Sequence, residues 1–146
     1  MELVMGEAIA LLNYTWLRDK GELRQRDDEG LAATFLASFF DAARLGASSP
    51  QTIAKAIIYN YLAQEWVFRY NASQRTFEVN APNLGKAVRK LTAEVLEIVG
   101  RGDYEGAGRL ILQFGILPGE VKSKLGELEN LPVGILPNYT SMPAEE

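Results

Sequence analysis

Apolar residues recur at intervals of three and four positions along most of the chain, which is the spacing of one face of an α-helix. This periodicity predicts six helices, over residues 3–20, 28–45, 51–64, 81–99, 103–114 and 118–128. The longest apolar stripe belongs to the fourth helix and consists of Leu84, Ala87, Val88, Leu91, Val95, Leu96 and Val99.

Residues that favour helix ends lie next to these segments. Ser49 is placed to cap the third helix through its hydroxyl group, and Pro50 fits the first position of that helix. Asn80 and Asp103 are placed to cap the fourth and fifth helices, and Gly21 fits a left-handed helix end. These signals agree with the boundaries that the apolar spacing gives.

Between the third and fourth helices the spacing changes to the two-residue alternation of strands. Residues 66–70 and 76–79 alternate, and residues 71–74 have the composition of a turn, so we predict a short β-hairpin. The predicted fold is all-α in the main: a helical domain over 1–131 with five to six helices and one small hairpin near 66–79. An extended C-terminal tail is expected over 132–146, where three prolines interrupt any helical period.

The apolar stripes also define a candidate core, in which helices pack on helices. The residues expected to be buried are Phe35, Phe39, Ile57, Tyr61, Leu91, Val95 and Leu110. On the fifth helix we further expect Tyr104 and Ile111 to face inward.

Composition narrows the possible chemistry. The 146 residues carry a formal net charge of −4, which disfavours broad binding to nucleic acid or anionic membranes. The sequence contains no Cys and no His, so it cannot form a disulfide, a Cys/His zinc site or a Ser-His-Asp triad. Glu2 and Glu7 do not fit a secretory signal, and no apolar run is long enough to span a membrane, so we expect a cytoplasmic protein.

The order of four sequence features resembles a known family. They are the segment TFLASFFDAARLG at 34–46, the helix with IYNYL at 58–62 and its following hairpin, GDYEGA at 102–107, and LPVGILP at 131–137. Their order and spacing resemble the C-terminal helical region of the dipeptidyl-peptidase III family of zinc peptidases. The likeness covers about residues 8–140 and is greatest to the branch often fused to a Nudix hydrolase domain.

This resemblance implies a largely helical lobe, but not a zinc site in this chain. The family holds zinc with a His-Glu-x-x-Gly-His type motif and with a Glu from a second, acidic motif. Because the chain has no His, the first motif is missing. Glu2 and Glu7 fall near the second motif but do not reproduce it, so we predict no metal, cofactor or catalytic residue within this chain.

The resemblance also implies two substrate-binding positions. Family members often carry a His, and in classical members an Arg one turn later, at the start of the third helix; these positions fall on Gln51 and Lys55. Lys55 keeps a positive charge but lacks the two-pronged guanidinium that grips a carboxylate. Positions i and i+4 share a helix face, so both side chains can line one groove; the alternative is a solvated helix start.

Three functional hypotheses follow. The first is a non-catalytic helical domain from the C-terminal portion of a dipeptidyl-peptidase III-like protein, whose parent is a zinc dipeptidyl-peptidase with its catalytic motif upstream or a Nudix hydrolase. The second is a stand-alone module that binds another protein or a second copy of itself. Its candidate contact residues are Trp16, Tyr59, Trp66 and Tyr70.

The third hypothesis is an enzyme that works without a metal through carboxylates or lysines, the available groups being Glu65, Glu94, Glu97, Lys55 and Lys90. The expected partners are the upstream part of the parent chain, another protein or a second copy, and neither nucleic acid nor a membrane.

Overall fold

The structure is a computed structural model that describes residues 1–23 and 28–130. These residues form six helices and one antiparallel pair of strands, so the fold is mainly α, as the sequence predicts. In chain order the elements are α1 (Glu2–Lys20), α2 (Asp28–Arg44), α3 (Pro50–Gln64), β1 (Phe68–Asn71), β2 (Thr76–Val79), α4 (Ala81–Arg101), α5 (Tyr104–Phe114) and α6 (Gly119–Glu127). The tail predicted over 132–146 lies outside the described residues.

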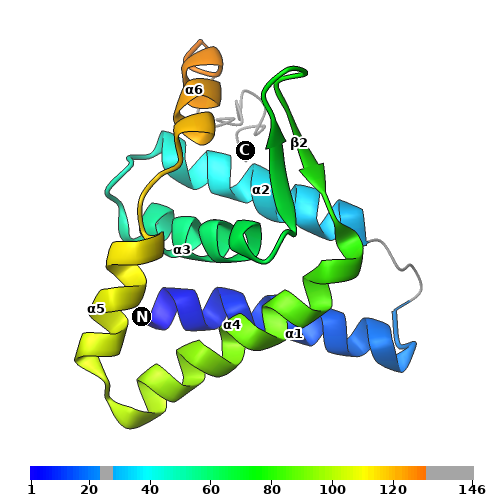
Figure 1. The fold of residues 1–146 in the computed structure, drawn as a ribbon, viewed down its shortest axis with the longest axis vertical. Helices are drawn as coiled ribbons and strands as arrows, with labels where there is room; N and C mark the ends of the chain where they lie inside the picture. Colours follow the sequence, from blue (N-terminus) through cyan, green and yellow to red (C-terminus); the bar gives the residue numbers. More distant parts are fainter. Residues whose placement is uncertain (24–27, 131–146) are drawn as a thin grey trace, which may run out of the picture.

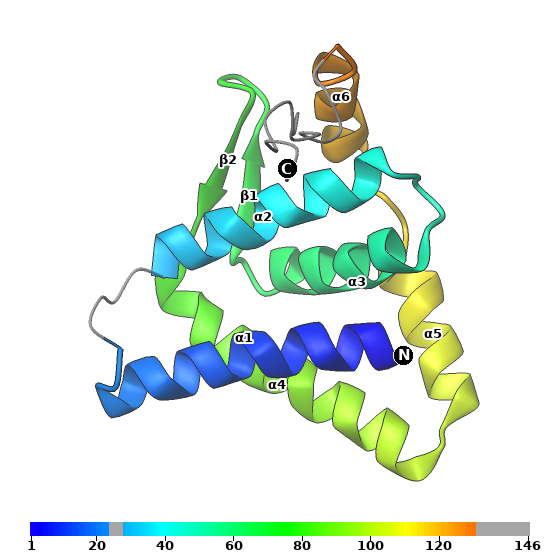
Figure 2. The same ribbon diagram turned by 180° about the vertical axis from the view of Figure 1, so that it is seen from behind.

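Helix α3 is the central element of the fold. It lies between α1 and α2 and also contacts α4, α5 and β1 (Figures 1 and 2). Helix α4 packs across α1 at an oblique angle, and α5 lies near the beginning of α1. The hairpin and α6 are at the opposite end of the molecule, where each contacts α2.

The predicted core is confirmed. All seven residues expected to be buried are at most 6% exposed. Tyr59 joins the helices to the hairpin, since its ring centroid lies 5.4 Å from that of Phe39 and 5.3 Å from that of Phe68. A two-stranded hairpin is marginal alone. These aromatic contacts attach it to α2 and α3.

Most of the predicted helix ends are confirmed. The Ser49 hydroxyl accepts a hydrogen bond from the Thr52 N–H at 3.1 Å, and the Asp103 carboxylate accepts one from the Gly106 N–H at 2.8 Å. Asn80 occupies the predicted N-cap position of α4, but its side chain forms no capping hydrogen bond. Its backbone N–H instead donates to the Val67 carbonyl at 2.8 Å, which fixes the approach of the chain from the hairpin to α4.

Part of the predicted burial is wrong. Tyr104 is 91% exposed, and Leu96, Val99 and Ile111 are also exposed. The apolar stripes of α4 and α5 are therefore wider than the area on which neighbouring elements of the described chain pack.

The chain leaves α3 through a turn that the sequence does not predict. We expected a strand from residue 66, but β1 begins at Phe68, and Trp66 has a left-handed backbone with φ 60°. The N–H groups of Trp66 and Val67 donate to the carbonyls of Ala63 and Leu62, at 3.0 and 2.9 Å. This is the helix-ending motif in which the left-handed residue is usually glycine.

Trp66→Gly is therefore expected to raise the free energy of unfolding by about 0.5–1 kcal/mol, because glycine adopts this backbone without the steric cost of a Cβ. The Trp66 side chain is 69% exposed, so its removal loses little packing. Trp66→Ala is the matched control, because it removes the ring and keeps the unfavourable φ. Urea unfolding followed by circular dichroism measures both; a glycine variant no more stable than the alanine variant would show that the turn is unstrained.

Candidate functional site

The side chain of Lys55 lies where three helices meet. Its ammonium donates to the Glu7 carboxylate of α1 at 2.8 Å and to the Ser38 hydroxyl of α2 at 3.1 Å. The Nζ atom also lies 5.7 Å from the ring centroid of Phe35 on α2. The Ser38 hydroxyl donates in turn to the Phe35 carbonyl at 2.7 Å, which orients its oxygen lone pairs toward Lys55.

This arrangement holds a partly desolvated positive charge in a fixed place. The Lys55 side chain is 14% exposed, and that of Glu7 is 38% exposed. Glu7 and Ser38 accept two of the three ammonium N–H bonds, and the aromatic ring of Phe35 stabilises the charge further. An ammonium of this kind is the type of group that binds an anion such as a carboxylate.

Gln51 lies one turn before Lys55 on α3 and is exposed. The spacing argument therefore places both residues on one helix, but it did not identify the partners of Lys55. Glu7 and Ser38 come from other helices, and no local sequence pattern reports a contact between residues 48 positions apart. Glu7, considered above as a remnant of a metal motif, is the counter-ion of Lys55 in the structure.

The residues present do not fit a zinc site. Within the described ranges, no group of three or more His, Cys, Asp or Glu side chains comes together as a metal would require. Over the full sequence there is no imidazole and no thiol to serve as a ligand.

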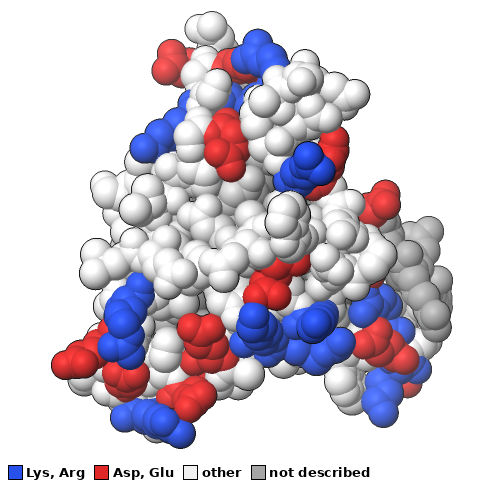
Figure 3. Space-filling model, in the orientation of Figure 1, with Lys and Arg blue, Asp and Glu red and all other residues white. Residues whose placement is uncertain are grey.

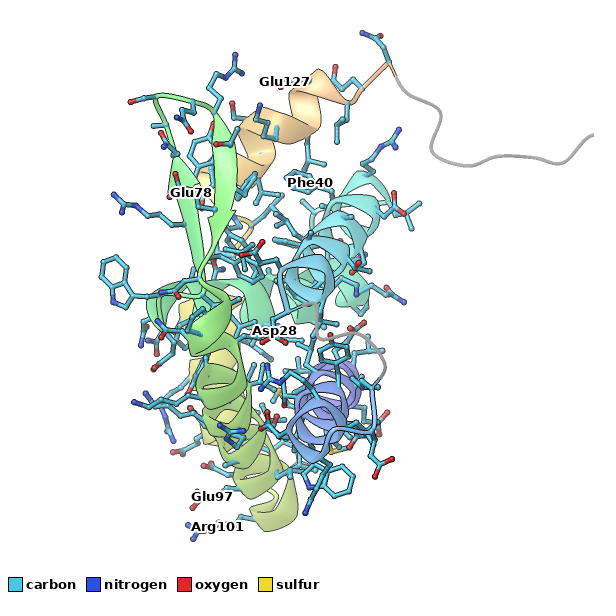
Figure 4. The ribbon with its side chains drawn as sticks, turned by 90° about the vertical axis from the view of Figure 1, so that its right-hand side faces the viewer. Asp28, Phe40, Glu78, Glu97, Arg101 and Glu127 are labelled. Atoms are coloured by element: carbon cyan, nitrogen blue, oxygen red, sulfur yellow. The ribbon has the colours of Figure 1, made fainter. Side chains whose placement is uncertain are left out.

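The carboxylates of the third hypothesis lie on surfaces beside partners. Glu65 forms an ion pair with Lys90, and Glu97 forms one with Arg101 at 3.0 Å near the end of α4 (Figure 4). Glu94 accepts a hydrogen bond from the Tyr61 hydroxyl at 3.1 Å. Burial, with the negative charge of Glu94 beside it, raises the pKa of Tyr61 above its ordinary value, so this phenol stays protonated and acts as a donor.

The charges of the surface do not form a field of one sign on the face seen in Figure 3. Lysines and arginines alternate there with aspartates and glutamates in the lower and upper parts, and an uncharged area over α3 separates them. No helix in the described part of the chain combines the length and apolarity needed to cross a bilayer.

Comparison with known proteins gives three relatives. No family model matches the chain. It is 30% identical over 141 residues to "Nudix hydrolase 3" of Arabidopsis thaliana. Two solved structures share the fold: DPP III (dipeptidyl-peptidase III) from Caldithrix abyssi, with a TM-score of 0.87 and 25% identity, and dipeptidyl-peptidase III from Corallococcus sp. strain EGB, with 0.83 and 29%.

These matches cover nearly the whole chain but only part of each relative. The plant protein is matched over 95% of this chain and 18% of its own length. The two structures are matched over 95% and 93% of this chain, and over 26% and 25% of theirs. The predicted resemblance to dipeptidyl-peptidase III, with a Nudix association, is thereby confirmed.

Proposed function

We propose that this chain is a non-catalytic helical domain, that it forms the C-terminal portion of a cytoplasmic dipeptidyl-peptidase III-like protein, and that any zinc-binding motif lies upstream of it. The observation that carries the proposal is that the match spans nearly all of this chain but only a small share of the solved protein. One fold matches 95% of this chain at a TM-score of 0.87, yet that match accounts for 26% of the solved protein. The absence of every histidine supports the same division, because a metal site of the family type needs imidazoles.

Within such a protein, Gln51 and Lys55 would contribute to the wall of the substrate cleft. The support is the partly desolvated ammonium of Lys55, which Glu7 and Ser38 hold in a fixed place. Its role is to bind and orient an anionic part of the substrate, because Glu7 and Ser38 hold this positive charge in one place.

The purified 146-residue chain is expected not to hydrolyse a dipeptidyl arylamide, with or without added Zn²⁺. Release of the arylamine is followed by fluorescence across the fractions of a size-exclusion column. Activity that co-elutes with the chain and persists through a second purification would contradict the non-catalytic assignment.

Lys55→Met is expected to weaken binding of a short peptide such as trialanine about tenfold, because one charged hydrogen bond to its carboxylate is lost. The measurement is a titration of the ¹⁵N-labelled chain, following the amide signals of Gln51 and residue 55. Lys86→Met is the matched control, since Lys86 is exposed on α4 and outside this cluster. Equal affinities for the two variants would remove Lys55 from the proposed site.

A second candidate function is the stand-alone binding module. It is favoured by the apolar residues that α4 and α5 leave exposed, Leu96, Val99, Tyr104 and Ile111. The aromatic set proposed for such a face needs correction, since Tyr59 is 1% exposed and belongs to the core. Trp16 and Trp66 are exposed, and Tyr70 is partly buried against Phe77.

A further inference from the structure

An apolar groove lies at the end of the molecule where α1 begins. It has a volume of about 540 Å³. Its walls come from the first turn of α1, the first half of α3, the end of α4 and the middle of α5, and they include Leu3, Val4, Ile53, Val99 and Ile111. Among its lining residues in the described part of the chain, the one charged side chain is that of Glu2.

The groove continues into a smaller hollow of about 190 Å³ between α4 and α5. The two share Met1 and Val99 in their walls, and Tyr104 lies on the far rim of the hollow. Floor and rim differ in exposure: Val4 is buried, whereas Leu3, Val99, Tyr104 and Ile111 are exposed. A continuous apolar surface therefore extends across both hollows.

The apolar periodicity of α4 and α5 indicates that this surface packs against another part of a protein. The apolar periods of α4 and α5 include Val99 and Ile111 as regular members of their stripes, next to the fully buried Val95 and the buried Leu110. A stripe of this width faces a core on its whole breadth in a complete protein. Here the described chain covers one edge of each stripe and leaves the other open, and open apolar patches of this kind mark interaction sites.

The comparisons indicate what covers it. In the two solved relatives this fold makes up 26% and 25% of the chain, so about three quarters of each polypeptide lies outside it. Met1 is itself part of the groove wall, and any polypeptide joined ahead of it would leave α1 at the rim. Among the described wall residues, the charged side chains are Glu2 in the groove and Asp103 in the smaller hollow, so the occupant is expected to be apolar over most of the contact.

We propose that this groove is the docking surface for an apolar segment from the remaining part of a dipeptidyl-peptidase III-like polypeptide. The inference rests on the proposed function and adds to it the surface through which the two parts associate. A segment with two or three leucine, isoleucine or phenylalanine side chains fits walls of this kind.

The absence of cysteine from the chain allows a direct test. Ile111→Cys places a thiol in the groove, and Leu112→Cys places one on the next residue of the same helix, outside the groove walls. Ile111 is 40% exposed and Leu112 is 77% exposed in the isolated chain, so both thiols are expected to react with a maleimide there. Val99→Cys is a second groove variant, which guards against a local effect of the substitution on α5.

The labelling rate is measured twice for each variant, in the isolated 146-residue chain and in the protein that the source cells produce from a gene carrying the same substitution, with peptide mass spectrometry to locate the label. Protection of the two groove variants in the native protein by at least tenfold, with no protection of Leu112→Cys, is the expected result. Equal rates in both forms would overturn the inference.

Two patterns of protection also overturn it. Protection in the isolated chain that grows with concentration would identify a second copy as the occupant. Protection in a native protein of 16.2 kDa would identify a separate partner. A heavier native protein with an unprotected groove would overturn the docking surface alone and leave the proposed function in place.

Discussion

Replacing Phe39 with alanine is expected to lower the free energy of unfolding by about 4 kcal/mol. Phe39 is fully buried on α2, and its ring packs at a centroid distance of 5.4 Å against Tyr59, which in turn stacks on Phe68 of the hairpin. The substitution removes apolar contacts and leaves a cavity where α2, α3 and β1 meet. Because interiors are close-packed, the surrounding helices relax into such a cavity only in part.

Urea unfolding followed by circular dichroism measures this loss. Leu45→Ala is the control, because Leu45 follows the end of the same helix and is 74% exposed; its change is expected to stay within about 0.5 kcal/mol. A loss below about 1 kcal/mol for Phe39→Ala would show that the aromatic cluster is not the centre of the core.

Replacing Arg18 with alanine is expected to destabilise the fold by about 3 kcal/mol. Arg18 lies near the end of α1 and donates to Asp28 at the start of α2 and to Asp19 at 2.7 Å. Figure 4 labels Asp28. Its side chain is 15% exposed and that of Asp28 is 20% exposed. Removing the guanidinium would leave the Asp28 carboxylate partly buried without its counter-ion.

The surroundings of Arg18 show how closely α1 approaches α4. The hydrogen bond to Asp28 raises the pKa of Arg18, so the guanidinium stays charged. The guanidinium passes over Gly85 of α4, where a Cβ would lie 3.0 Å from its Nη2 atom. A glycine within a helix is unfavourable by itself, and here it provides room for the ion pair.

The test compares Arg18→Ala with the double variant Arg18→Met, Asp28→Asn. The double variant removes both charges and keeps most of the volume, so it is expected to recover at least half of the loss. If the two variants unfold at the same urea concentration, the cost arises from lost packing and not from an unpaired carboxylate.

The sequence predicts the helices well because each carries its own apolar period and its own end signals. Ser49 with Pro50, and Asp103, act through neighbours within three residues, so the capping bonds can be foreseen from the chain alone. Trp66 shows where this reasoning fails. A bulky residue in a position that normally requires glycine leaves no sequence signal, since the turn is imposed by the bonds to Leu62 and Ala63.

The site is predictable to a smaller extent. Position on a helix face identifies Lys55, but its contacts to Glu7 and Ser38 depend on how α1 and α2 cross α3, which periodicity does not encode. The same limit explains the exposed side chains of α4 and α5. Spacing predicts which face is apolar, whereas the covering of that face depends on how other elements pack against it.

The most direct test of the central claim is the intact mass of the native protein, immunoprecipitated from its source cells and measured by mass spectrometry. A mass several times 16.2 kDa is expected, because the fold occupies about a quarter of the dipeptidyl-peptidase III chains that share it. A mass of 16.2 kDa would contradict the assignment of these residues to a larger dipeptidyl-peptidase III-like protein.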